Sequence, residues 1–246
     1  MITLSAMQPH YLPWLGYFEL IRLSDKFVFL DDVKTTNSKS YFNRTKLSIN
    51  GITKWSTVPL DQLTAKGPLN LVQTTSNDWL EAQINRMQEW YRDSPGIDNA
   101  VEFITSLPTT RFLNDFNISL NNELLKELHI DTTIFIGSTL EVKSSSTDRL
   151  IELCKKLNAN HYLTGHGAYK YLDHLKFEEH NIEVSYINYN WDCSGLNDSV
   201  DGPYLSVFDY LSRNFNDMDK RTQSSVIPWR DFNEKMIGFQ SNVARN

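Results

Sequence analysis

A proline-rich loop near the N-terminus carries the first side chains that could do chemistry. Its residues are Gln8-Pro9-His10-Tyr11-Leu12-Pro13-Trp14-Leu15-Gly16-Tyr17. His10 is of a type that can hold a phosphate or transfer a proton near neutral pH. The prolines stiffen the loop, and Gly16 lets the backbone turn sharply or approach a ligand. The alternative is a rigid turn in which His10 only bonds to backbone groups.

Two adjacent carboxylates, Asp31 and Asp32, follow the next apolar segment, Lys26–Leu30. Paired carboxylates at a strand end can bind a cation, accept a proton or hold an ammonium group. Asn43, Arg44 and Lys46 come shortly afterwards, and the two cations could pair with phosphates. The structural alternative is an ordinary loop in which Asp31 or Asp32 pairs with Arg44.

A third group of candidates lies in the second half of the chain, around Thr164-Gly165-His166-Gly167 and Tyr171. A strand, a glycine turn and a helix start together form a natural anion site. His166 is a second candidate for acid–base chemistry. Lys143 is a candidate phosphate ligand, and Ser146 or Thr147 is most simply a helix N-cap. The histidines do not show metal-ligand spacing, so we expect no metal site.

Periodicity predicts the elements that position these residues. The segments 2–7 and 26–30 are typical of strands and 16–23 of a short helix, which makes a βαβ opening. Residues 47–58 suit a hairpin around Asn50-Gly51. Further helices are expected at 79–91, 100–106, 117–128, 148–157 and 169–179, and further strands at 133–137, 159–163 and 184–189.

This order predicts an α/β fold, a doubly wound, mostly parallel, Rossmann-like sheet. We expect a single domain over 1–246 with a helical insertion at about 65–125, and a surface helix and tail over 214–246. Open α/β sheets bind ligands outside the carboxyl ends of their strands. The candidates His10, Asp31-Asp32 and His166 all follow predicted strands.

Composition narrows the function further. The net charge of −6 argues against a nucleic-acid partner, since phosphate-backbone binding requires a basic surface. Cys154 and Cys193 are the only cysteines, which indicates a reduced compartment. The sequence shows neither a signal peptide nor a membrane span. We therefore expect a cytoplasmic protein, and the sequence leaves a homo-oligomer open.

Several of these segments resemble the WbqC-like protein family. They are Met7–Phe18, Phe27–Val33, Asn43-Arg44, Tyr162–Gly165, Tyr171–Asp173 and Leu205–Leu211. Departures from the family pattern are Lys34, where members commonly have Gln, Tyr41-Phe42 in place of a Trp-Gln-like pair, and His166 in the glycine turn. The resemblance implies a role in O-antigen (lipopolysaccharide) or other surface-polysaccharide biosynthesis, in which nucleotide-linked deoxyamino sugars are built and decorated.

The leading hypothesis is a transferase or amide ligase that attaches an acyl or aminoacyl group to the amine of a nucleotide-linked deoxyamino sugar. Its partners would be that nucleotide sugar and a small acyl or amino-acid donor. The cofactor stays undetermined, with ATP and Mg²⁺ as candidates. The catalytic candidates are His10, Asp31, Asp32 and His166. The candidate substrate or nucleotide ligands are Gln8, Tyr11, Trp14, Gly16, Tyr17, Asn43, Arg44, Lys46, Lys143, Thr164, Gly165 and Tyr171.

In this hypothesis His10, with Asp31 or Asp32, removes the ammonium proton. Arg44, Lys46 and the Gly165 turn hold a pyrophosphate, and Trp14, Tyr11 or Tyr17 form a flat pocket for a base.

Two other functions stay open. Nucleotidyl transfer is suggested by His10 standing fifteen residues before Asp25, a spacing similar to that of nucleotidylyltransferases and pantothenate synthetases. Those enzymes carry a His-x-Gly-His loop, and Pro13 occupies the place of their second His. An ATP-dependent ligase belongs to the same alternative. The third possibility is a non-catalytic pathway protein that binds a sugar enzyme.

Overall fold

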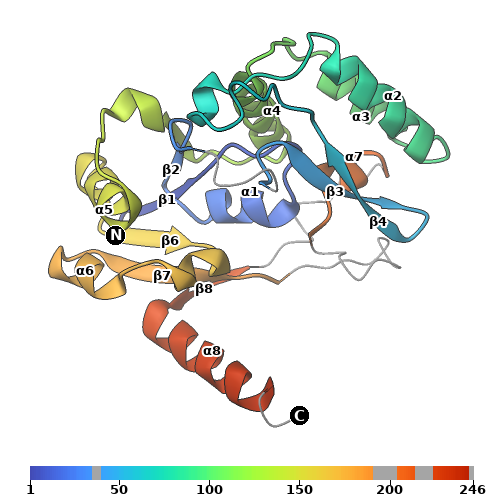
Figure 1. Ribbon diagram of the computed structural model, residues 1–246. Coiled ribbons are helices and arrows are strands. Elements are labelled where there is room, and N and C mark those ends of the chain that lie inside the picture. The colour runs from blue at the N-terminus through green and yellow to red at the C-terminus, as the bar shows by residue number, and fades with distance from the viewer. Residues whose placement is uncertain (35–39, 191–203, 214–223, 244–246) are drawn as a thin grey trace.

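The main sheet has six strands in the order β5-β2-β1-β6-β7-β8 (Figure 1). The computed structural model describes residues 1–34, 40–190, 204–213 and 224–243. The strands are β1 (Thr3–Met7), β2 (Lys26–Phe29), β5 (Thr133–Ile136), β6 (His161–Thr164), β7 (Glu183–Asn188) and β8 (Ser225–Pro228). All pair in parallel except β8, which runs antiparallel to β7.

The path of the chain through the sheet defines where a ligand would bind. From β1 the chain moves outward to β2 and β5, and then returns to β6 on the other side of β1. The sheet therefore has its topological switch point between β1 and β6. Ligands of open α/β sheets bind at this point, outside the carboxyl ends of the strands.

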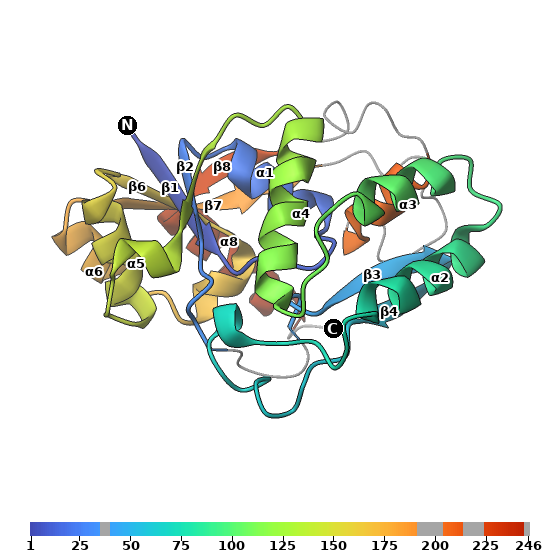
Figure 2. The same cartoon turned by 90° about the horizontal axis from the view of Figure 1, so that it is seen from above.

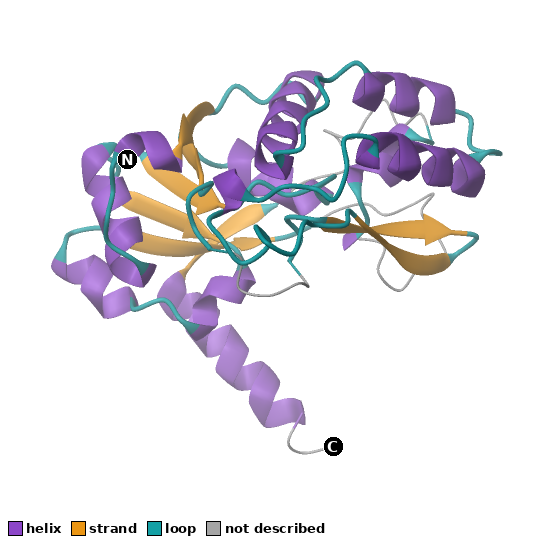
Figure 3. Ribbon diagram, turned by 45° about the horizontal axis from the view of Figure 1, so that its top comes forward, coloured by secondary structure: helices purple, strands orange, loops and turns teal. Residues whose placement is uncertain are grey.

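Helices cover both faces of the sheet, as Figure 3 shows. On one face, α1 (Leu15–Arg22) and α4 (Leu113–Glu127) share a core with Phe27 and Phe29 of β2. On the other face, α5 (Ser146–Lys156), α6 (His174–Glu179) and α8 (Trp229–Val243) share a second core with Val28. Successive β2 side chains enter opposite cores, as expected for a strand buried on both faces. The predicted Rossmann-like α/β fold is confirmed.

A second group of elements lies beside the sheet. A hairpin of β3 (Arg44–Ile49) and β4 (Ile52–Thr57) is followed by η1 (Leu69–Leu71), α2 (Trp79–Tyr91) and α3 (Ile97–Thr105). Figure 2 shows α2, α3 and the hairpin on one side of α4, with the main sheet on the other. The hairpin turn is Asn50-Gly51, and both residues have positive φ, as a two-residue hairpin turn demands. The single domain with an insertion at about 65–125 stays a prediction.

The later elements differ from expectation in several places. The predicted helix 169–179 is divided into η3 (His166–Lys170) and α6, because Asp173 caps α6 by accepting from the Lys176 N–H at 3.1 Å. The segment 214–246 was expected to hold a helix and tail, but it also supplies β8. Four residues ending in Pro228 give too short a pattern to identify as a strand. The chain also forms η2 (Gly137–Leu140) and α7 (Val207–Leu211). No helix within the described ranges is long and apolar enough to cross a membrane.

Candidate functional site

A cavity of about 560 Å³ opens at the carboxyl ends of β1 and β6. This is the switch point of the sheet, and the volume is typical of a small-molecule site. Its apolar lining includes Ala6, Leu30 and Tyr162. Its polar and glycine lining comprises Gln8, His10, Lys34, Ser146, Arg149, Thr164, Gly165, Gly167 and Tyr171. Five of these were predicted from sequence, namely Gln8, His10, Thr164, Gly165 and Tyr171.

His10 is a buried, neutral imidazole in the wall of this cavity. Only 9% of the residue is exposed, and burial lowers the pKa of His10 to about 3. Its ring lies between Tyr17, at a centroid distance of 4.7 Å, and Tyr41, at 5.5 Å. The Nδ1 atom has no hydrogen-bond partner among the described residues. Nδ1 is itself buried, and a bound anion in the cavity would raise the pKa of His10.

Two buried asparagines of α4 hold the His10 loop. Asn117 Nδ2 donates to the Pro9 carbonyl at 3.1 Å, and Asn121 Nδ2 donates to the His10 carbonyl at 2.9 Å. Asparagines four residues apart lie on one helix face, and here that face also carries Leu113, Phe116, Leu120 and Leu124 of the core. The sequence analysis missed these residues. Amides repeating on the apolar face of a predicted helix were the available signal.

The turn of the loop occurs at Leu12 and not at the predicted Gly16. Leu12 has φ of 42°, in the left-handed region. Its carbonyl accepts hydrogen bonds from Thr45 Oγ1 at 2.8 Å and Ser206 Oγ at 2.9 Å. Gly16 is the second residue of α1 and is buried. The loop is thus tied to β3 and to the start of α7, far along the chain.

The two carboxylates after β2 have separate partners. Asp32 Oδ1 accepts from Arg149 Nη2 at 2.6 Å. Asp31 is buried and accepts from the Ser138 N–H at 2.7 Å and the Ser138 hydroxyl at 2.6 Å. The structural alternative that paired them with Arg44 is therefore wrong. Only the Asp32–Arg149 pair reaches the cavity, through Arg149.

Arg149 is the main residue of the cavity lining that the sequence analysis missed. It lies in the first turns of α5, is 9% exposed, and donates through Nη1 to the Val142 carbonyl at 3.0 Å. Its Nε–H has no partner among the described residues. An arginine within an amphipathic helix pattern is usually exposed, so its type and spacing gave no signal.

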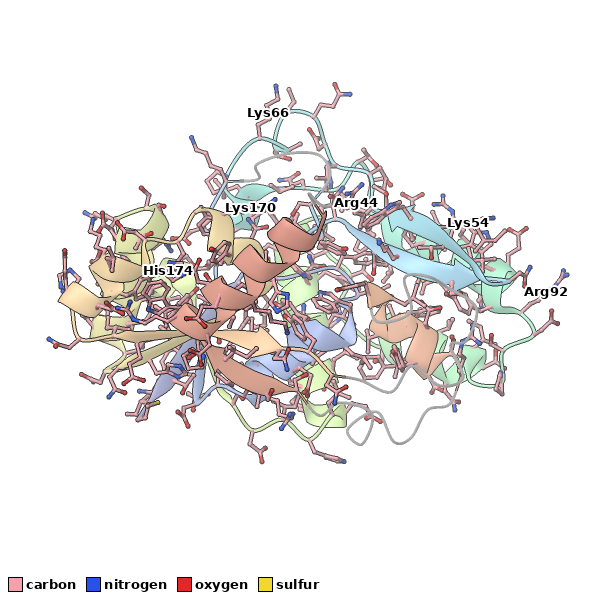
Figure 4. All side chains as sticks on the ribbon, turned by 90° about the horizontal axis from the view of Figure 1, so that it is seen from below. Arg44, Lys54, Lys66, Arg92, Lys170 and His174 are labelled. Carbon is pink, nitrogen blue, oxygen red and sulfur yellow. The ribbon has the colours of Figure 1, made fainter. Side chains whose placement is uncertain are left out.

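The hairpin residues lie close to His10 without lining the cavity. The Arg44 guanidinium lies 3.9 Å from the centroid of the Trp55 ring. The Tyr41 ring packs against both Trp55, at a centroid distance of 5.6 Å, and His10, at 5.5 Å. Lys46 Nζ lies 5.5 Å from the centroid of the Trp55 ring. Asn43 is buried, and its Nδ2 donates to the Val58 carbonyl at 3.1 Å. Figure 4 shows Arg44 at the hairpin end nearest the sheet, with Lys54 further along it.

The aromatic residues predicted to form a base pocket lie elsewhere. Tyr11 and Tyr17 are core residues, each 1% exposed, so neither offers a free ring face. Trp14 packs against Tyr189 at 5.0 Å and Tyr204 at 5.1 Å between centroids. Tyr171, 63% exposed at the cavity, is the aromatic ring in the lining that a flat ligand can reach.

Three further candidates stand outside the cavity lining. His166 Nε2 lies 2.6 Å from the Ile187 carbonyl, and burial lowers the pKa of His166. Lys143 is exposed before α5. Asp25 lies at the amino edge of the sheet, where its Oδ2 accepts from the Thr3 N–H at 2.7 Å. The spacing from His10 to Asp25 therefore does not bring the two side chains together.

Helix α5 begins at the cavity without a side-chain cap. Its N-cap residue is Ser145, whose side chain makes no capping hydrogen bond. Neither Ser146 nor Thr147 is the N-cap, in contrast to the sequence prediction. Ser146 and Arg149 lie on one face of α5 and both line the cavity. Within the ranges that the structure describes, no three His, Cys, Asp or Glu side chains form a group able to hold a metal ion.

Fold and site together define a doubly wound α/β protein with a cavity at its switch point. The chain belongs to the WbqC-like protein family, whose model matches residues 8–220. A similar protein is the uncharacterized protein Rv1507c of Mycobacterium tuberculosis (strain ATCC 25618 / H37Rv), 26% identical over 195 residues. That match covers 77% of this chain and 84% of the relative. No solved structure matches the chain significantly.

Proposed function

We propose that this protein is an enzyme of surface-polysaccharide biosynthesis, such as that of O-antigen, that acylates the amine of a nucleotide-linked deoxyamino sugar. The observation that carries the proposal is His10, a neutral imidazole in the wall of a cavity that is also lined by two cations. A sugar amine needs a hydrogen-bond acceptor to take its proton, and a nucleotide needs cations for its phosphates. Membership of the WbqC-like family supports the pathway.

His10 would act on the amine as it attacks the acyl carbon. The nitrogen lone pair forms the new C–N bond, the bond from the acyl carbon to its carrier breaks, and the amine proton passes to the His10 imidazole. In the free protein this imidazole is a weak base, because burial lowers its pKa to about 3. A phosphate bound beside it would raise the pKa of His10 toward a useful range, since an anion favours the imidazolium. Substrate binding would then switch on the base.

The test is an assay of product mass. The full chain is incubated with UDP- and dTDP-linked amino sugars and with either acyl-coenzyme A or an amino acid plus ATP and Mg²⁺. We expect a sugar product heavier by one acyl group. His10→Gln keeps a polar side chain of similar size but cannot take the proton, and we expect it to retain nucleotide-sugar binding and to lose about 10²–10⁴-fold in rate.

Lys54→Ala is the matched control, because Lys54 is exposed on β4, outside the cavity lining. It should leave the rate unchanged. A product that carries a nucleotidyl group would replace the proposal with nucleotidyl transfer. Absence of any product, with nucleotide sugars failing to bind at millimolar concentration, would refute the proposal.

A further inference from the structure

Among the described residues, the cavity lining contains two cations and no carboxylate, although the chain as a whole is acidic. The protein carries a net charge of −6, yet Lys34 and Arg149 both line the cavity. Lys34 follows β2, and Arg149 projects from α5, so two separate elements bring cations to the same space. A cavity that gathers positive charge within an acidic protein favours an anionic ligand.

The protein holds Arg149 through both terminal nitrogens of its guanidinium group. Asp32 Oδ1 and the Val142 carbonyl accept from its two terminal nitrogens, while the Nε–H has no partner among the described residues. The side chain is nine-tenths buried. A buried donor without an acceptor is costly, so the protein keeps this cation in the cavity lining at a cost in stability. Guanidinium groups suit phosphate oxygens because of their planar fork.

The start of α5 adds a second donor group. This 11-residue helix begins at Ser146, which lines the cavity, and the Ser145 side chain leaves its first turn uncapped. The first-turn N–H groups of a helix have no partner within the helix, and together with the helix dipole they favour an anion at that end. Gly167, another lining residue, has open space where a Cβ would stand, which leaves room there for a ligand.

We propose that Arg149, Lys34 and the uncapped first turn of α5 form a subsite for the diphosphate group of a nucleoside diphosphate. This inference rests on the proposed function, and it names the diphosphate as the part of the nucleotide sugar that these residues bind. Two cations from different elements and one helix terminus suit two adjacent phosphates better than one. Tyr171, 63% exposed at the cavity, supplies a ring face for the base, and His10 stands where the sugar amine would react.

Asp32 is a positioning residue for this subsite. Its carboxylate fixes Arg149 Nη2 at 2.6 Å and also offsets part of the guanidinium charge. Asp32→Asn keeps an oxygen acceptor for Nη2 but removes the negative charge. We therefore expect Asp32→Asn to bind a diphosphate several-fold more tightly than the unaltered chain. A merely structural pair would leave diphosphate affinity unchanged.

The experiment is calorimetric titration of the full chain with inorganic pyrophosphate, UDP, dTDP, ADP and uridine. Pyrophosphate and the nucleoside diphosphates should bind, with affinity falling as salt rises, and uridine should bind far more weakly. Lys34→Ala should weaken pyrophosphate binding about tenfold, and Lys54→Ala should not change it. Arg149→Gln should weaken pyrophosphate binding more than Lys34→Ala does, and circular dichroism checks that the variant is folded. If Arg149→Gln does not fold, Lys34→Ala and Asp32→Asn still test the subsite.

The five ligands also identify the source of the diphosphate. Tighter binding of UDP or dTDP than of ADP assigns the subsite to the nucleotide sugar, and the reverse assigns the same subsite to ATP. Pyrophosphate binding that is absent, or equal in the Lys34→Ala and Lys54→Ala variants, would overturn the subsite. Because these are binding measurements, they can fail while the acylated product is still found, and they can succeed where no such product forms.

Discussion

Asn121 of α4 donates from Nδ2 to the main-chain carbonyl of His10 at 2.9 Å, across 111 positions of sequence. Asn117, one turn earlier, does the same for Pro9 and also donates to the Phe42 carbonyl at 2.8 Å. The helix beside the sheet thus holds the loop that carries the candidate base. Orientation of His10 depends on side chains that touch no ligand, in the way that a supporting shell fixes a functional group.

Asn121→Ala removes this support and should destabilise the protein by about 1–3 kcal/mol, because it leaves the buried His10 carbonyl without that donor. Urea unfolding of the two proteins measures the difference. Asn122→Ala changes the neighbouring, partly exposed residue and should shift the midpoint little. Equal effects of the two substitutions would mean that the bond to His10 contributes no specific stability.

The pH dependence of stability should report the burial of His10. Its pKa is about 3 in the folded protein, against 6.5 for an unperturbed histidine. The unfolded chain therefore binds a proton that the folded chain excludes, and the stabilisation present above pH 6.5 is lost as the pH falls toward 3. In His10→Gln this loss, of the order of a few kcal/mol, should be smaller.

Urea unfolding at pH 7 and pH 4.5 gives the change in the free energy of unfolding with pH for the unaltered protein and for His10→Gln. His180→Gln, at an exposed site, should keep the slope of the unaltered protein. A His10→Gln variant as acid-sensitive as the unaltered protein would show that His10 is accessible to protons in the folded state.

Local patterns predicted much of the fold. Helix α2 was predicted with its observed bounds, and the hairpin followed from Asn50-Gly51, because periodicity and turn chemistry are properties of neighbouring residues. The position of the cavity followed from the alternation of strands and helices. His10 and Gly165 could be placed there because each comes directly after a strand of the parallel sheet.

The partners of the site residues could not be predicted. Arg149 lies 117 positions from Asp32, and no periodicity indicates which cation reaches a given carboxylate. Tyr11 and Tyr17 were assigned to ligand binding because aromatic residues serve both cores and pockets, and a sequence does not separate the two. In the structure both tyrosines are buried in the core. The short strand β8 pairs with β7 through tertiary contact, which outweighs local propensity.

A buried carboxyl group in α7 should make the stability of the protein depend on pH in the direction opposite to that expected for His10. Asp209 in α7 is fully buried, and burial raises its pKa from 3.8 to about 7. Its Oδ1 accepts from the Tyr91 hydroxyl at 2.6 Å and the Ser48 N–H at 3.0 Å. The folded state favours the neutral acid, so stability is fully present below pH 3.8 and is lost as the pH rises through 7.

Asp209→Asn should flatten this decline between about pH 4 and pH 7, because the amide oxygen can accept both bonds without ionising. Thermal unfolding at the two pH values measures it, and Asp93→Asn, at an exposed site, serves as the control. A decline of the same steepness in Asp209→Asn would assign it to another group.

The close packing behind the two carboxylates makes Gly137 a position with little tolerance. A Cβ added there would stand 2.9 Å from the Phe29 carbonyl oxygen and 3.3 Å from the Oδ1 atoms of Asp31 and Asp32. Since the nearest atom belongs to the backbone of a central strand, it cannot move aside cheaply. Gly137→Ala should therefore cost about 1–3 kcal/mol of stability. Gly167→Ala places the same methyl group in open space and should leave the unfolding midpoint close to that of the unaltered protein. If both glycine variants unfolded at the same urea concentration, the tight contact at Phe29 would not limit residue 137.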